Sequence, residues 1–212
     1  MRIAIIGGGP GGLYFALLMK KRFPDYDVTV YERNRADDTF GFGVVFSDET
    51  LDNLMDYDAE SYAGITREFS YWDEIDFHFH REVVRSTGHG FCGTERRTLL
   101  MVLQARCREL GVKLRFSREI TDLDELEDAD LIVAADGINS FIRSRYEEHF
   151  QPTVELRRNH FIWLGSSAPS EAFSFHFTTN EFGIWDLCTY QYRRDMSTWV
   201  IEAPEATWAK AE

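Results

Sequence analysis

The sequence lacks three features that secreted and membrane-spanning proteins usually have: paired cysteines, a long apolar run and a cleavable leader. Its three cysteines, Cys92, Cys107 and Cys188, are scattered and odd in number. This pattern does not fit a disulfide framework and is typical of a reducing compartment. No apolar run is long enough to span a bilayer. The opening residues, MRIAIIGGGPGG, lead into glycines rather than into a small-residue cleavage site. We therefore expect a cytoplasmic protein.

Basic residues are also scarce, with 23 Lys and Arg against 36 Asp and Glu, which gives a net charge of −13. A field of this sign repels phosphate backbones and anionic lipid head groups, so we expect neither a nucleic-acid partner nor a membrane partner. Aromatic side chains, in contrast, are plentiful: 17 Phe and 5 Trp occur among the 212 residues. They provide apolar surface for a globular core or for a pocket that takes a flat ligand.

The first 150 residues alternate between strand and helix patterns. The apolar run RIAIIG at 2–7 and the β-branched run DVTVYER at 27–33 predict strands, and GGLYFALLMKKRF between them predicts a helix that ends before Pro24. A strand–helix–strand unit implies a parallel pair with a right-handed crossover. A central helix is expected over 94–110, and a further buried strand over 129–137. We therefore expect an α/β domain of Rossmann type at residues 1–150.

Other segments complete the predicted fold. We expect a glycine-punctuated loop at 40–46, a short helix capped by Ser47, one strand at 74–84 and one helix at 139–150. After Pro152 the composition shifts to short aromatic and β-branched runs separated by turn residues. These runs predict an antiparallel sheet. The second part of the chain, 151–212, is therefore expected to be the beginning of a β-rich substrate domain.

The strongest local motif is a glycine turn that follows the first predicted strand and opens the first predicted helix. In Gly7-x-Gly9-x-x-Gly12, one glycine permits a tight turn, one lets the backbone reach a pyrophosphate and one allows close helix–strand packing. Glu32 follows about 20 residues later, where a carboxylate accepts from ribose hydroxyls and disfavours a 2′-phosphate. The alternative is a turn needed for packing alone. The motif predicts FAD or NAD binding by these residues: Gly7, Gly9, Pro10, Gly11, Gly12, Glu32 and Arg33.

Two further segments favour FAD over NAD. ERRTLLMVL has an R-x-x-L-x-x-x-L spacing that starts at Arg96, and DLIVAADGINSFIR ends a strand with Asp136 and Gly137. With the glycine turn, these segments resemble the single-component FAD-dependent aromatic hydroxylases, the family of para-hydroxybenzoate hydroxylase. The resemblance implies that Asp136 and Gly137 lie near the FAD pyrophosphate and that Arg96, or its neighbour Arg97, contacts FAD.

The segment TFGFGVVFSDETLDNL resembles the loop that runs beside the flavin ring in this family. The resemblance therefore adds Gly43 and Val44 to the predicted cofactor contacts. FGFGVVFSDETL, GHGFCGTERR and RNHFIWLG bring the chain closest to the monooxygenase part of salicylyl-CoA 5-hydroxylases and 2-aminobenzoyl-CoA monooxygenase/reductases. They are also similar to the indole-directed hydroxylase of violacein pigment synthesis.

The resemblance implies an activity. Enzymes of this family reduce FAD with NAD(P)H, form a flavin C4a-hydroperoxide with O2 and hydroxylate a small aromatic substrate, here including an aromatic CoA thioester. The cofactor supplies the chemistry, so no catalytic residue is assigned. His78-x-His80 lacks the further ligands that a metal needs, and no metal is expected.

Two other functions stay open at this stage: a flavin-dependent reductase or dehydrogenase of the same fold, and a non-catalytic nucleotide-binding protein. Members of the family continue beyond the length of this chain and carry a later Gly-Asp flavin motif, which these 212 residues do not contain. We therefore expect an N-terminal fragment whose substrate domain is partial.

Overall fold

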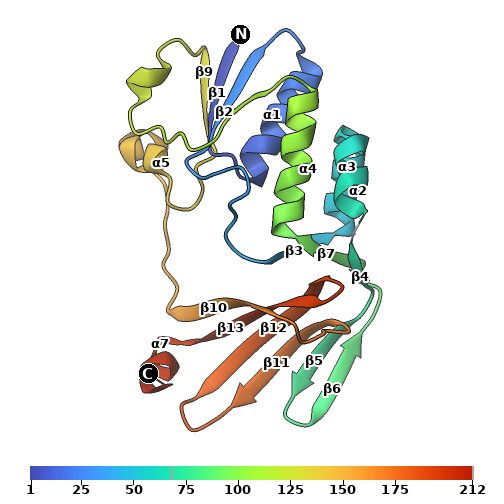
Figure 1. The fold of residues 1–212 in the computed structure, drawn as a ribbon. Helices are drawn as coiled ribbons and strands as arrows, with labels where there is room; N and C mark the ends of the chain where they lie inside the picture. The colour runs from blue at the N-terminus through green and yellow to red at the C-terminus, as the bar shows by residue number, and fades with distance from the viewer. Residues whose placement is uncertain (68, 212) are drawn as a thin grey trace. The chain divides into compact units, whose positions relative to one another are not determined.

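The computed structural model describes residues 1–67 and 69–211, which form two compact units (Figure 1). The first unit comprises Met1–Thr39, Tyr57–Gly64 and Arg97–Val154, and the second comprises Phe40–Asp56, Ile65–Arg96 and Glu155–Glu212. The chain enters the second unit for the last time after Val154, close to the predicted boundary at 150. Two earlier segments also belong to the second unit, so each unit is built from pieces far apart in the sequence.

The first unit is built on a four-stranded parallel sheet in the order β8-β2-β1-β9. This parallel sheet confirms the predicted strand–helix–strand start and the α/β class. Its strands are β1 Arg2–Ile6, β2 Asp27–Tyr31, β8 Lys113–Arg115 and β9 Leu131–Ala134. Its helical elements are α1 Pro10–Arg22, α3 Ala59–Thr66, α4 Arg96–Glu109, the 3-10 helix η1 Leu123–Leu126, α5 Phe141–Arg145 and α6 Glu147–Phe150, of which α3 and α4 each have one end in the second unit.

Both faces of this sheet are covered. Side chains alternate along a strand, so Ala4 and Ile6 of β1 lie on one face, where they form a buried cluster with residues from the segments after β8 and β9. Ile3 and Ile5 lie on the other face and are almost fully buried. Helices α1 and α4 pack against each other, since the Cys107 thiol lies 3.3 Å from the Leu13 carbonyl oxygen. The central strand β1 is therefore packed on both sides within the first unit.

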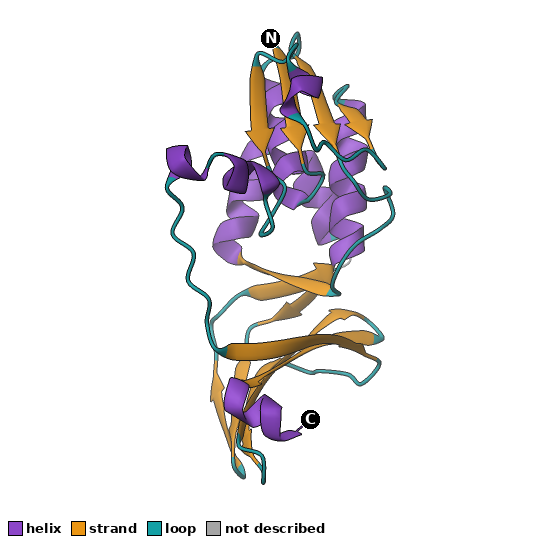
Figure 2. Cartoon of the chain, turned by 90° about the vertical axis from the view of Figure 1, so that its left-hand side faces the viewer, coloured by secondary structure: helices purple, strands orange, loops and turns teal. Residues whose placement is uncertain are grey.

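The second unit contains two sheets, which Figure 2 shows as orange strands. A six-stranded sheet has the order β10-β13-β12-β11-β5-β6, and a three-stranded sheet has the order β3-β7-β4. The large sheet is antiparallel except for the β5–β11 pair, which is parallel. Its strands are β5 Ile75–Phe79, β6 Glu82–Ser86, β10 Asn159–Ser166, β11 Phe173–Thr179, β12 Ile184–Arg193 and β13 Met196–Pro204. The other elements are β3 Gly43–Ser47, β4 Ser70–Trp72, β7 Phe91–Glu95, α2 Asp48–Tyr57 and α7 Glu205–Ala211.

The four antiparallel strands predicted after Pro152 are confirmed, and so is the cap of α2. The Ser47 hydroxyl accepts from the backbone N–H of Thr50 at 3.4 Å. The prediction of one strand over 74–84 is wrong, because the chain turns at His80, which has a φ of 55°, and returns as β6. Alternating polar and apolar residues are as compatible with a hairpin as with one long strand.

Three other predicted elements differ from the structure. The loop predicted at 40–46 is strand from Gly43 onward, because it pairs with β7. The helix predicted from Thr94 begins at Arg96, because Thr94 pairs with Val44 in that same ladder. The single helix predicted at 139–150 breaks at Tyr146, whose φ of −110° leaves the helical region between α5 and α6. Each difference follows from pairing or local backbone geometry that composition does not encode.

Within the described residues, no helix combines the length and the apolar character that crossing a bilayer requires.

The three cysteines carry free thiols, and Cys92 and Cys107 are completely buried. Burial raises the pKa of the Cys107 thiol to about 12, and it has the same effect on Cys92.

Candidate dinucleotide-binding site

The glycine turn after β1 adopts a conformation that larger residues cannot share. Gly7 has a φ of +110°, and a Cβ built on it would lie 2.1 Å from the carbonyl oxygen of Ala135. A Cβ on Gly12 would lie 2.0 Å from the carbonyl oxygen of Gly7. The first contact brings the end of β9 against the end of β1, and the second brings α1 against the turn. Both glycines are therefore required by close backbone approach.

The other glycines of the turn leave its outer side open. No described atom outside the helix backbone lies within 4 Å of a Cβ built on Gly9 or Gly11. Helix α1 begins at Pro10 after the cap residue Gly9; no side chain in the described part of the chain caps it, and its first turn contains no acid. Uncapped N–H groups at the positive end of a helix dipole are a site for an anion. The turn can therefore accept a phosphate.

Glu32 lies beside this turn and is held in place by three hydrogen bonds. Its Oε2 accepts from the backbone N–H of Gly8 at 2.7 Å. Its Oε1 accepts from the backbone N–H and the side-chain amide of Asn34, both at 2.8 Å. The carboxylate is thus oriented at the end of β2, next to the end of β1. Sequence reasoning missed Asn34, although an amide two residues after an acid at a strand end is a recognisable signal.

Asp136 also lies at this edge of the sheet, and the structure gives it a local role. A Cβ on Gly7 would lie 2.9 Å from the backbone nitrogen of Asp136, so the two loops touch. The Asp136 Oδ2 accepts from the N–H of Phe141 at 2.9 Å and thereby caps α5 together with Ser140. Gly137 has a φ of +80° and allows the intervening turn. The carboxyl ends of β1, β2 and β9 thus bring together Gly7, Glu32 and Asp136, as expected for ligand sites in parallel sheets.

The remaining predicted contacts are less constrained or lie in the second unit. Arg33 is exposed and forms a 4.0 Å ion pair with Glu119. In the second unit, Gly43 donates its N–H to the Thr198 hydroxyl at 3.1 Å and accepts from the Tyr190 hydroxyl at 2.9 Å. A Cβ on Gly43 would lie 2.6 Å from the Cβ of Tyr192, so close packing by itself requires a glycine at this position. The predicted contact of Gly43 with a flavin stays a prediction.

Val44 and Arg96 belong to the second unit as well. Val44 pairs with Thr94 in the β3–β7 ladder. The Arg96 backbone N–H donates to the carbonyl oxygen of Phe42 at 2.8 Å. Its side-chain Nε is buried and has no hydrogen-bond partner among residues 1–67 and 69–211. A buried guanidinium donor without a partner is the kind of group that a bound ligand satisfies, so the predicted role of Arg96 keeps a physical basis.

Comparison with known proteins identifies relatives of the whole chain. A family profile described as an NAD(P)-binding Rossmann-like domain matches residues 5–65, which include the glycine turn and Glu32. Salicyloyl-CoA 5-hydroxylase from a Streptomyces species is 41% identical over 211 residues, which are 100% of this chain and 41% of that protein. Protodeoxyviolaceinate monooxygenase from Chromobacterium violaceum is 32% identical over 216 residues, with coverages of 100% and 57%. The chain thus spans about half the length of the curated relatives it matches.

Solved structures show the same fold. The tetrameric form of 2-methyl-3-hydroxypyridine-5-carboxylic acid oxygenase superposes with a TM-score of 0.81 at 20% identity, covering 97% of this chain and 59% of that one. A probable FAD-dependent monooxygenase from Pseudomonas aeruginosa has a TM-score of 0.73 at 16% identity, with coverages of 99% and 62%. These structural matches confirm the predicted α/β fold. The resemblance to aromatic monooxygenases is confirmed by the named relatives above.

Proposed function

We propose that this protein acts as an FAD-dependent monooxygenase that hydroxylates an aromatic substrate, with NAD(P)H as the electron donor and O2 as the oxidant. The observation that carries the proposal is the open glycine turn next to the oriented Glu32 carboxylate, in a chain similar along its whole length to named monooxygenases. When bound, FAD supplies the redox chemistry of the reaction.

The residues of the first unit fit the adenosine diphosphate half of FAD. The uncapped N–H groups at the start of α1 would bind the pyrophosphate, and Gly9 and Gly11 leave room for it. Glu32 would accept from the ribose hydroxyls, while its negative charge would oppose a 2′-phosphate. Asp136, held as a cap of α5, would orient the loop that faces the turn. This donor set fits the adenosine diphosphate half of FAD, and the relatives named as monooxygenases support a nicotinamide dinucleotide as the transient co-substrate.

For the substrate, we propose an aromatic acyl group carried as a thioester. Support comes from the 41% identity with a relative named salicyloyl-CoA 5-hydroxylase. The many aromatic side chains of the second unit, which include stacked Phe77 and Phe175 with ring centroids 5.5 Å apart, offer flat apolar surface for such a ring.

The test is an oxygen-labelling experiment on the intact gene product. Purified protein is incubated with FAD, NADH or NADPH, salicyloyl-CoA and ¹⁸O2, and the product is analysed by mass spectrometry. We expect one ¹⁸O atom in the aromatic ring, with NAD(P)H consumed in proportion. A product reduced without added oxygen would identify a reductase instead. Bound FAD with no oxidation of NADH or NADPH would identify a non-catalytic nucleotide-binding protein.

A further inference from the structure

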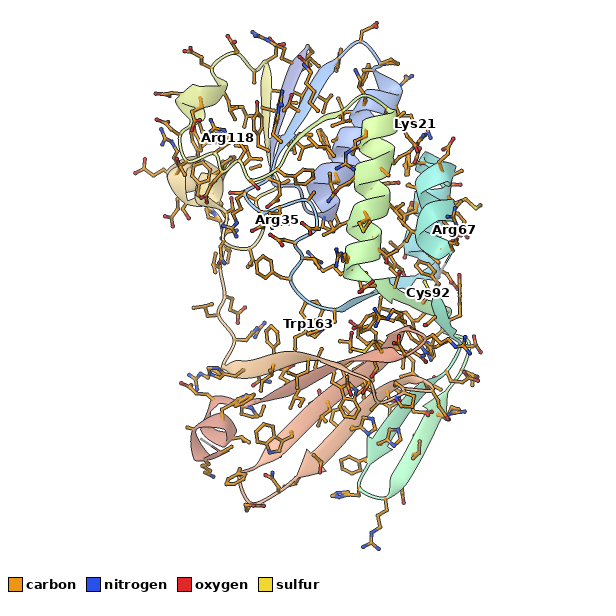
Figure 3. All side chains as sticks on the ribbon, in the orientation of Figure 1. Lys21, Arg35, Arg67, Cys92, Arg118 and Trp163 are labelled. Atoms are coloured by element: carbon orange, nitrogen blue, oxygen red, sulfur yellow. The ribbon has the colours of Figure 1, made fainter. Side chains whose placement is uncertain are left out.

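One face of the six-stranded sheet carries an aromatic surface interrupted by acidic residues. Cross-strand pairing places Phe161 of β10, Glu202 of β13, Asp186 of β12 and Phe177 of β11 in one row across the sheet. Because side chains alternate along each strand, residues two positions away form the next row on the same face. That next row includes Trp163 of β10, which Figure 3 labels.

Two polar atoms on this face are buried and unsatisfied. The Asp186 Oδ1 and the Trp163 Nε1 have no hydrogen-bond partner in the part of the chain that the structure describes. Buried polar groups are nearly always paired in native proteins, so an unpaired acceptor and an unpaired donor on one face call for an explanation. A ligand that supplies the complementary groups is such an explanation.

Glu202, the other acid in this row, differs from Asp186 because it has a hydrogen-bond partner. The Glu202 Oε1 accepts from the side-chain amide of Asn159 at 2.7 Å, so Glu202 has a partner within the sheet. Burial, together with the charge of Glu202, raises the pKa of Asp186. A raised pKa means that the environment disfavours the charge of this carboxylate, and a hydrogen-bond donor brought to it would relieve that penalty. Asp186 is therefore the acid of this row that a ligand donor would stabilise.

Aromatic side chains on the same face as Asp186 offer flat apolar surface; Phe177 is its direct neighbour, and Phe161 lies beyond Glu202 in the same row. Phe161 is 66% exposed and Phe177 is 37% exposed, although both are large apolar residues. Trp163 is fixed in place, because a Cβ on Gly41 would lie 2.2 Å from its ring. Apolar and aromatic side chains with a few placed polar groups are the usual lining of a small-molecule site.

We propose that this face binds a planar aromatic molecule that bears a hydrogen-bond donor on its ring, an amino or a hydroxyl group, and that Asp186 accepts from that donor. The inference deepens the proposed function, on which it rests, because the molecule is the aromatic substrate of the hydroxylation. An electron-donating amino or hydroxyl group also activates the ring toward transfer of an electrophilic oxygen. Asp186 thus acts as a specificity-determining residue rather than as a catalytic one.

The test compares matched probes with and without the donor. Binding of 4-aminobenzamide, 4-hydroxybenzamide and benzamide to the intact protein is measured by isothermal titration calorimetry in the absence of NAD(P)H and O2. We expect both donor-bearing probes to bind about tenfold or more tightly than benzamide, as a hydrogen bond to a carboxylate allows. In Asp186→Leu this preference is lost, and in Asp186→Asn, which keeps a neutral acceptor, part of it remains.

The control is Asp195→Leu, which removes the same charge from the exposed turn between β12 and β13, where Asp195 pairs with Arg193 at 2.7 Å. This variant should keep the full preference. Thermal unfolding adds a second readout, because removing an unpaired buried acceptor should leave the melting temperature of Asp186→Leu unchanged or raised. Equal affinity of the wild type for all three probes, or a preference that survives in Asp186→Leu, would overturn the proposal. So would a large drop in the melting temperature of Asp186→Leu, which would assign Asp186 to the fold.

The role proposed for Asp186 and the proposed monooxygenase activity can fail independently of each other. If Asp186→Leu still hydroxylates salicyloyl-CoA with the wild-type preference for donor-bearing rings, the monooxygenase stands and the role of Asp186 falls. If no product forms in any variant but the probe preference depends on Asp186, the site stands and the monooxygenase falls.

Discussion

The residues of the glycine turn have different surroundings, and these differences predict different tolerance to substitution. A Cβ on Gly12 would overlap the carbonyl oxygen of Gly7, whereas a Cβ on Gly11 meets no described atom within 4 Å outside the helix backbone. We expect Gly12→Ala to lower the free energy of unfolding by about 1–3 kcal/mol, the usual cost of overpacking. Gly11→Ala, the matched control, should change it by less than about 1 kcal/mol. Urea unfolding followed by circular dichroism measures both; equal effects would contradict the observed packing.

The buried thiols make a second prediction at this scale. Because burial raises the pKa values of Cys92 and Cys107 to about 12 each, almost no thiolate forms at either residue at pH 8. We expect neither thiol to react with 5,5′-dithiobis(2-nitrobenzoate) within minutes in the native protein. All three cysteines of the chain should react once urea unfolds it. Rapid labelling of Cys92 or Cys107 in the folded state, identified by peptide mass mapping, would show that their surroundings open readily.

At the scale of elements, one buried carboxylate links the helices of the first unit. The side chain of Asp58, at the start of α3, is 0% exposed and pairs with Lys21 of α1 at 2.9 Å and with Arg106 of α4 at 3.0 Å. Asp58 also accepts from the backbone N–H of Ser61 at 3.0 Å. These charged hydrogen bonds outweigh the effect of burial and lower the pKa of Asp58.

This link predicts a pH dependence of stability. A depressed pKa in the folded state means that Asp58 stabilises the fold above its unfolded pKa near 3.9 and that this contribution is lost as the pH falls below it. We expect Asp58→Asn to lower the free energy of unfolding by about 3–5 kcal/mol at pH 7, because Lys21 and Arg106 lose their buried partner. The difference from wild type should persist at pH 5 and shrink at pH 3.

The control for this prediction is Glu60→Gln. Glu60 also pairs with Arg106, at 3.3 Å, but its side chain is 62% exposed. Exposed pairs contribute about 0–1 kcal/mol, so Glu60→Gln should have a small effect at every pH. Urea unfolding of the three proteins at pH 3, 5 and 7 gives the comparison. A difference between Asp58→Asn and wild type that grows toward pH 3 would refute the assigned sign.

Elements whose pattern reflects burial could be predicted from the sequence, and those set by pairing partners could not. Strands β1, β2 and β9 are short apolar runs between clear breakers, and all three form where the sequence predicts them. The predicted burial is correct for β1 but wrong for β9, which lies at the edge of the sheet with Leu131 37% exposed. The hairpin at His80 could not be distinguished from one strand, because both keep the same alternation of residues. The start of α4 depends on the pairing of Thr94 with Val44, two residues far apart in the sequence.

At the scale of the whole molecule, the candidate sites also contain residues that the local sequence predicts and residues that it does not. The glycine spacing, Glu32 and the Asp136-Gly137 turn are local signals, and the structure brings them to one edge of the parallel sheet. Asp186 and Trp163 carry no local signal, since their relation arises only when three strands align. Likewise, 40–56 and 65–96 join the second unit through long-range contacts that composition does not reveal.

The central claim is that the glycine turn binds the adenosine diphosphate half of FAD, and a fluorescence titration tests it most directly. FAD and riboflavin, which lacks that half, are titrated into the wild type, Gly11→Ala and Gly12→Ala at a temperature where circular dichroism shows all three folded. We predict that FAD binds Gly11→Ala and Gly12→Ala at least about tenfold more weakly than the wild type, or about 1.4 kcal/mol. The first variant places a Cβ in the room left for the pyrophosphate, and the second displaces the carbonyl oxygen of Gly7. Riboflavin should bind all three weakly and equally. Equal FAD affinity in all three proteins, or riboflavin binding as tight as that of FAD, would contradict the claim.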